Sequence, residues 1–125
     1  MSDCNACIYT GADEGDPPEF LKSTVVTARK DHKCCECHAV IPPKTKYERT
    51  VGKWDGDMNH YETCLPCAEI REAFCCDGWV YGQLWEDAVN GEFFEHMTTG
   101  CLEKLMTAEA KTFLIARWNE WKFDK

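Results

Sequence analysis

The chain has 125 residues, 44% hydrophobic and 29% charged, a composition typical of one globular domain rather than a disordered segment. Its formal net charge is −8, so it repels phosphate backbones, and we expect a basic protein surface rather than a nucleic acid as its partner. No apolar run approaches the ~20 residues that span a bilayer, which excludes a membrane-spanning helix. We therefore expect no membrane partner.

The first segment, residues 1–33, is predicted to be an N-terminal arm that begins with a paired turn, Cys4-Asn-Ala-Cys7. Pro17 and Pro18 forbid a helix in its middle. Ser23–Thr27 is β-prone and predicts a short strand at best. Because the first residues lack the basic and apolar regions of a signal peptide, we expect the protein to act in the cytoplasm.

The second segment, residues 34–78, contains two Cys-x-x-Cys pairs. Cys34 and Cys37 form the first pair, and Cys64 and Cys67 form the second, with 26 residues between the two pairs. A turn of this type offers two sulfurs to one ion, and a structural zinc ion takes four such ligands in a tetrahedron. The spacing therefore predicts a closed four-cysteine zinc site.

A β-hairpin is predicted between the two cysteine pairs. Asp55-Gly56 separates two β-prone runs, which is among the strongest hairpin signals in a sequence. A two-residue loop there pairs Arg49 with Glu62 and Val51 with His60. The first pair joins opposite charges across the strands, which supports this register.

A helix is predicted to follow the second cysteine pair. Pro66 suits a first helical turn, and Ile70, Ala73 and Phe74 fall on one face at helical spacing. Gly78 is predicted to end this helix. Knuckle, hairpin and helix in this order are the treble-clef arrangement, so we predict an α+β fold with the treble clef at its centre.

The third segment, residues 79–125, shows helical patterning. Short helices are predicted over 81–89 and 99–106, and Thr107 is predicted to cap a longer helix over 108–121. The stripe of that longer helix consists of Ala110, Phe113, Leu114, Arg117, Trp118 and Trp121. We expect this helical extension to pack on the zinc module, and part of a partner surface to include the two tryptophans.

The remaining cysteines predict a second metal site that ties the arm to the helical end. The predicted ligands of this second zinc ion are Cys4, Cys7, Cys76 and Cys101, with Cys75 or His96 as substitutes. One alternative is that Cys75 and Cys101 are small buried hydrophobes. Another is a disulfide framework, which a reducing compartment disfavours. The sequence thus predicts one zinc ion and allows two.

Two catalytic interpretations compete with a structural zinc site. Cys64-Leu-Pro-Cys67 resembles a redox motif, but the parallel sheet of a thioredoxin-like fold is not predicted. Nucleases of the His-Asn-His type use the treble clef, but the hairpin offers only His60 and no second histidine follows on the helix. We therefore expect the protein not to be an enzyme.

Several stretches resemble a group of small proteins from tailed bacteriophages and prophages. They are residues 28–37, 52–56 and 63–71, with 16–20 and 99–102 as further matches. The resemblance covers most of the chain and implies a phage accessory protein acting in the bacterial cytoplasm. His38 stands where those proteins usually carry glycine, so the turn after the knuckle departs from their pattern.

Together these features predict a phage-borne, zinc-stapled interaction protein that binds and modulates a host bacterial protein, in host takeover or inhibition of a defence system. The alternative is a zinc-dependent nucleic-acid-binding or regulatory protein. It rests on fold analogy and on basic residues such as Arg29, Lys30 and Arg49. The acidic remainder of the chain argues against this alternative.

Overall fold

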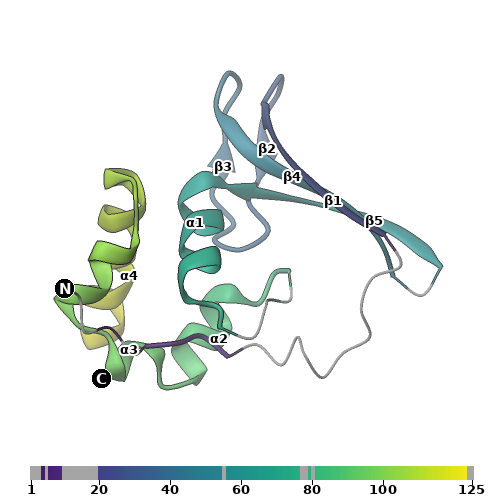
Figure 1. Ribbon diagram of the computed structural model, residues 1–125. Coiled ribbons are helices and arrows are strands. Elements are labelled where there is room, and N and C mark those ends of the chain that lie inside the picture. Colours follow the sequence, from purple (N-terminus) through teal and green to yellow (C-terminus); the bar gives the residue numbers. More distant parts are fainter. Residues whose placement is uncertain are drawn as a thin grey trace.

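The structure is a computed structural model that describes residues 4, 6–9, 20–54, 56–76, 79 and 81–123 (Figure 1). It is a mixed α+β fold, as predicted. The strands are β1 (Phe20–Thr27), β2 (His32–Lys33), β3 (Val40–Ile41), β4 (Lys46–Trp54) and β5 (Asp57–Cys64). The helices are α1 (Leu65–Phe74), α2 (Leu84–Asn90), α3 (Phe93–His96), the 3-10 helix η2 (Thr99–Lys104) and α4 (Ala108–Phe123).

The three long strands form an antiparallel sheet in the order β1-β4-β5. The predicted hairpin register is confirmed, because Arg49 lies opposite Glu62 and Val51 lies opposite His60. β2 and β3 form a separate two-stranded ladder around the first cysteine pair. In Figure 1, α1 lies between the sheet and α4, so one helix connects the two halves of the molecule.

Strand β1 is longer than the sequence predicts. Its eight residues pair with β4 along their whole length, from Phe20 opposite Lys53 to Thr27 opposite Lys46. Only Ser23–Thr27 carries the β-branched signal, so the first three residues of the strand are ordered by pairing with β4 rather than by their own propensity. β1 therefore joins the N-terminal arm to the predicted hairpin through its pairing with β4.

Helix α1 begins as predicted, with Pro66 in its first turn, and buries Ile70 and Phe74 completely. It ends at Phe74, earlier than the predicted stop at Gly78, and the latter lies outside the described residues. In α4, the backbone N–H of Ala110 donates to Thr107 Oγ1 at 3.2 Å, which confirms Thr107 as the cap. No helix in the described part of the chain has the length and apolar character needed to cross a membrane.

The N-terminal segment packs beside the end of α1. Ile8 is fully buried, and its N–H donates to the carbonyl oxygen of Phe74 at 2.8 Å. Two disulfides fix this segment to the helical half, Cys4–Cys101 and Cys7–Cys76. The predicted link between the arm and the helical end is present, but it is covalent.

The prediction of a second zinc ion is therefore wrong. Its four proposed ligands are the cysteines of the two disulfides, and a sulfur bonded to another sulfur has no thiolate to offer a metal. The proposed substitutes do not join them: Cys75 is a buried free cysteine, and His96 is exposed and contacts Glu92 at 3.2 Å. The sequence prediction grouped these four cysteines, but it gave neither their pairing nor their chemistry.

Candidate metal centre

The structure gathers the four cysteines of the first predicted site. The sulfurs of Cys34, Cys37, Cys64 and Cys67 all lie within 4.8 Å of one another, and none of the four residues is in a disulfide. Among the described residues this is the only group of three or more cysteine, histidine or acidic side chains arranged to hold a metal ion. Cys34 and Cys67 are fully buried.

Two local structures position these sulfurs. The first pair lies in a tight turn, in which the N–H of His38 donates to the Cys34 carbonyl at 3.0 Å. His38 has a φ of 64°, the positive value expected after such a knuckle, although its side chain is not the usual glycine. Cys64 ends β5, and Cys67 lies in the first turn of α1, whose N-terminus stabilises negative charge.

Backbone and side-chain N–H groups point at the sulfurs. Cys34 Sγ accepts hydrogen bonds from the N–H of Glu36 and the N–H of Cys64, each at 3.4 Å. Trp85 Nε1, from α2, donates to Cys67 Sγ at 3.3 Å. Such donors stabilise thiolates and orient ligands around a metal. The sequence does not identify Trp85 as a site residue, because nothing in its neighbourhood marks it as a donor to a cysteine 18 positions away.

The thiols compete for negative charge. Hydrogen bonds from Cys37, Cys64 and Cys67 hold the pKa of Cys34 far below its usual range, against the effect of burial. The pKa of Cys67 is raised far above its usual range, first by its hydrogen bonds to Cys34 and Cys37 and then by burial. Four thiolates cannot share so small a volume unaided, whereas a bound cation deprotonates coordinating thiols outright.

The donor set fits a tetrahedral metal ion. Four sulfurs at the ~2.3 Å bond length of zinc are about 3.8 Å apart. The sulfurs of Cys37 and Cys64 are 3.8 Å apart. If an ion is bound, all four of its tetrahedral positions are taken by protein sulfurs.

A buried ion cluster lies directly beside the knuckle. Arg71, from α1, is 1% exposed and donates to the fully buried carboxylate of Glu36 at 2.9 Å. It also pairs with Glu48 of β4. The other Glu36 oxygen accepts the N–H of Leu84 at 3.1 Å, at the start of α2. This cluster connects the knuckle, the sheet and two helices. No pattern in the sequence predicts it.

Cys35 lies beside the site but is not part of it. Burial raises the pKa of its thiol to about 11, and its sulfur is 3.4 Å from Thr63 Oγ1. A neutral, hydrogen-bonded thiol is neither a good ligand nor a good nucleophile at neutral pH. Cys35 is therefore a packing residue of the knuckle.

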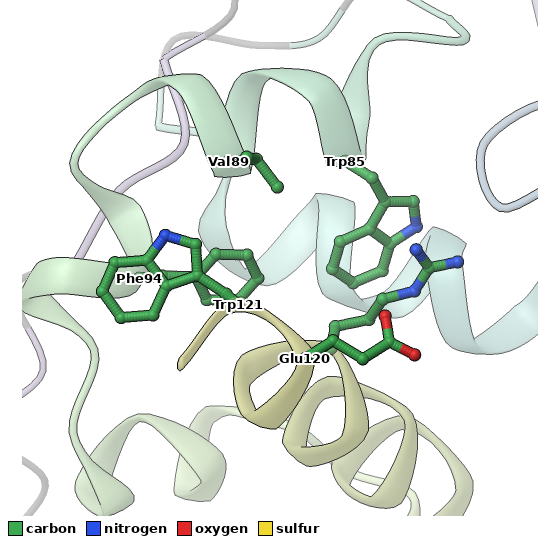
Figure 2. A pocket seen from close by; sticks show the side chains of 6 residues that line it. Trp85, Val89, Phe94, Glu120 and Trp121 are labelled. Carbon is green, nitrogen blue, oxygen red and sulfur yellow. The ribbon is translucent and has the colours of Figure 1, made fainter. Parts of the chain in front are cut away.

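The two tryptophans predicted for a partner surface lie differently. Trp121 lines a pocket of about 130 Å³ between α2 and α4, where Trp85, Val89 and Phe94 form the other apolar walls (Figure 2). Trp118 is half-buried outside this pocket, and the ammonium group of Lys122 lies 3.7 Å from its ring centroid. Only Trp121 combines a concave surface with access from solvent.

Comparisons with known proteins give no match to this chain, whether with protein-family models, with curated proteins or with solved structures.

Proposed function

We propose that Cys34, Cys37, Cys64 and Cys67 bind one structural zinc ion, and that the chain acts as a non-catalytic binding protein. The arrangement of the four sulfurs is the observation that carries this proposal, because they are spaced for a tetrahedral ion. Thiolates are soft ligands that favour zinc over magnesium or calcium. A closed shell leaves no position for a substrate or a reactive water, which distinguishes structural from catalytic zinc.

Metal analysis and a ligand variant test the zinc centre. We expect one equivalent of zinc per chain in elemental analysis, and loss of the metal with cooperative unfolding of the knuckle and hairpin in Cys64→Ser. Cys35→Ser is the matched control, because it removes a neighbouring thiol outside the site. A Cys64→Ser protein with full metal content and an unchanged melting temperature would contradict the proposal.

The proposed partner is a basic protein surface that inserts an apolar side chain between α2 and α4. Residues 65–125 carry eleven acidic and six basic side chains, so this half of the chain attracts positive charge. The pocket at Trp121 offers aromatic walls, and Glu120 lies at its edge. Aromatic anchors in pockets supply much of the binding energy of protein interfaces.

The resemblance to phage and prophage proteins supports a host bacterial protein as this partner, with host takeover or inhibition of a defence system as the outcome. On the same basis we propose the bacterial cytoplasm as the location. The two disulfides are more typical of oxidising compartments. Cell fractionation decides between these settings, and we expect the chain in the cytoplasmic fraction.

A pull-down from bacterial lysate with mass spectrometry tests the interaction. We expect a host protein to be captured by the native chain and at least tenfold less of it by Trp121→Ala. Phe123→Ala is the matched control, because Phe123 is 87% exposed two residues further along the same helix and does not line the pocket. Equal capture by all three proteins would exclude this pocket as the contact.

One observation favours nucleic-acid binding as a second candidate function. Residues 20–64 carry eight basic and six acidic side chains in an otherwise acidic protein. Arg71 neutralises part of this acidity by pairing with Glu36 and Glu48. By strand register, Lys22, Arg49 and Lys53 share one face of the sheet.

A gel-shift assay with single-stranded DNA and RNA at increasing salt tests this second candidate. Binding through the sheet predicts an affinity that falls steeply with salt, with a shallower slope for Arg49→Gln and Lys53→Gln. Lys111→Gln, in the acidic half, is the control. No shift at low salt would exclude the candidate.

A further inference from the structure

β1 is an edge strand that exposes apolar side chains. β1 pairs with β4 on one side only, and no described strand lies on its other side. Seven of its eight residues are exposed, among them Phe20 at 48%, Leu21 at 48% and Val25 at 59%. A long apolar edge strand is a template for pairing with another strand.

The other edge of the sheet is different. β5 carries Asp57, Asn59, His60 and Glu62, whereas β1 carries a single charged side chain, Lys22. Native proteins protect edge strands with charges, prolines or bulges. The sequence of β1 has no proline, and its register with β4 advances without a bulge. α1 packs on β4 and β5, so the helices cover the part of the sheet that lies away from the β1 edge.

β1 is self-complementary in one antiparallel register. If Ser23 lies opposite Ser23 of a second copy, Leu21 falls opposite Val25 and Phe20 opposite Val26. Apolar residues then face apolar residues on both faces of the sheet, and such cross-strand pairs stabilise antiparallel strands. Lys22 falls opposite Thr24, so no like charges are directly opposed.

We propose that two copies of this chain associate through β1, antiparallel, to form a continuous six-stranded sheet with two-fold symmetry. Such an isologous contact is the commonest kind in homodimers. In this register Phe20–Val26 of each copy pair, and seven paired residues bury less than the about 800 Å² per partner of a standard interface, so the dimer dissociates on dilution. The two pockets at Trp121 and the two basic sheet faces stay accessible, which makes the assembly bivalent.

The mass in solution tests the proposal. Light scattering after size exclusion gives this mass. We expect it to rise from 14.4 kDa toward twice that value over a hundredfold increase in concentration. Leu21→Lys and Val25→Glu, each alone, are expected to weaken association at least tenfold, because each places a charge opposite an apolar residue. Val40→Lys is the control, since Val40 is 64% exposed but lies on β3.

Mixing the two β1 variants tests the register. In a heterodimer of the two variants, the introduced lysine at position 21 of one copy lies once opposite the introduced glutamate at position 25 of the other. Because these charges attract, association is expected to return to within a few-fold of the native chain. A mass of one chain at all concentrations would overturn the proposal. The edge of β1 would then be a candidate for pairing with a strand of another protein. A dimer that neither β1 variant weakens, or that the mixture does not restore, would overturn it as well. Circular dichroism confirms that each variant is folded.

Discussion

At the scale of single residues, Arg71 connects most parts of the molecule. Its guanidinium pairs with Glu36 of the knuckle and Glu48 of β4, and it lies 4.8 Å from the ring centroid of Trp79 and 4.9 Å from that of Tyr81. Its pKa stays raised because the attraction of the two carboxylates outweighs the effect of burial. Burial, in turn, raises the pKa of Glu36. Each charge is tolerated in the interior only because the other is present.

Replacing Arg71 is therefore expected to be far more damaging than its hydrogen bonds alone would indicate. Arg71→Ala leaves the Glu36 carboxylate buried without a counter-charge, which costs about 3–5 kcal/mol of unfolding free energy. Urea unfolding measures the loss. Arg49→Ala, an exposed arginine on the sheet, is expected to change stability by less than about 0.5 kcal/mol. Similar losses for the two variants would contradict the role of the cluster.

Trp85 is predicted to tune the metal centre. Trp85→Phe keeps an aromatic ring, although a smaller one, and removes the N–H that donates to Cys67 Sγ. We expect a 10- to 100-fold loss of zinc affinity, the usual effect of losing an outer partner of a ligand. Competition with a chromophoric chelator measures it. Trp121→Phe should leave the zinc affinity unchanged, and an unchanged affinity in Trp85→Phe would show that this hydrogen bond is immaterial.

At the scale of elements, the start of α4 is fixed by one side chain from α1. Glu69 accepts hydrogen bonds from the Thr107 N–H at 3.2 Å and the Thr107 hydroxyl at 2.9 Å. Thr107 Oγ1 in turn accepts the N–H of Ala110. These hydrogen bonds add to the packing of α4, which buries Ala110 and Leu114 completely on one face.

Thr107→Ala is expected to lower the unfolding free energy by about 1 kcal/mol through loss of the helix cap, with a further loss from Glu69. Thr107→Ser retains the hydroxyl and should stay close to the native stability, because serine caps helices at least as well as threonine. Thermal unfolding of the three proteins gives the comparison. Equal melting temperatures for the alanine and serine variants would show that the cap does not stabilise α4.

At the scale of the whole molecule, two kinds of sulfur chemistry hold the chain together. The Cys4–Cys101 and Cys7–Cys76 disulfides join positions 97 and 69 residues apart, while the cysteines of the metal centre remain free. Cross-links that close long loops restrict the unfolded chain most. The disulfides therefore stabilise the contact between the N-terminal segment and the helices, away from the metal centre.

Removal of the longer cross-link is expected to leave the metal in place. The double variant Cys4→Ser/Cys101→Ser should lose up to about 4.7 kcal/mol of unfolding free energy, the value of the chain-entropy model for a loop of roughly 100 residues. The loss is smaller where the Cys7–Cys76 disulfide already closes part of that loop. Its zinc content should equal that of the native chain. Loss of metal from this variant would show that these cysteines belong to a metal site after all.

The whole molecule shows where the chain must be divided for its charge pattern to become visible. The net charges of residues 1–33, 34–74 and 75–125 are −2, −2 and −4, a nearly even spread. Grouped by the structure, residues 20–64 of the sheet and knuckle carry +2, and residues 65–125 carry −5. The boundary lies between β5 and α1, where the second cysteine pair begins.

The sequence by itself determined what local rules control. Two Cys-x-x-Cys turns identified the four clustered sulfurs, Asp55-Gly56 set the hairpin register, and Thr107 marked the start of α4. These features depend on the chemistry and spacing of neighbouring residues, which the chain order preserves. For the same reason the clustering of these four cysteines could be predicted residue by residue.

Only the tertiary structure decided which distant residues meet. It paired Cys4 with Cys101 and Cys7 with Cys76, extended β1 along β4, buried Arg71 between two glutamates and brought Trp85 to Cys67. Each of these contacts joins residues at least 18 positions apart. A side chain that becomes buried takes its partner from the packing around it, so no local pattern records the choice.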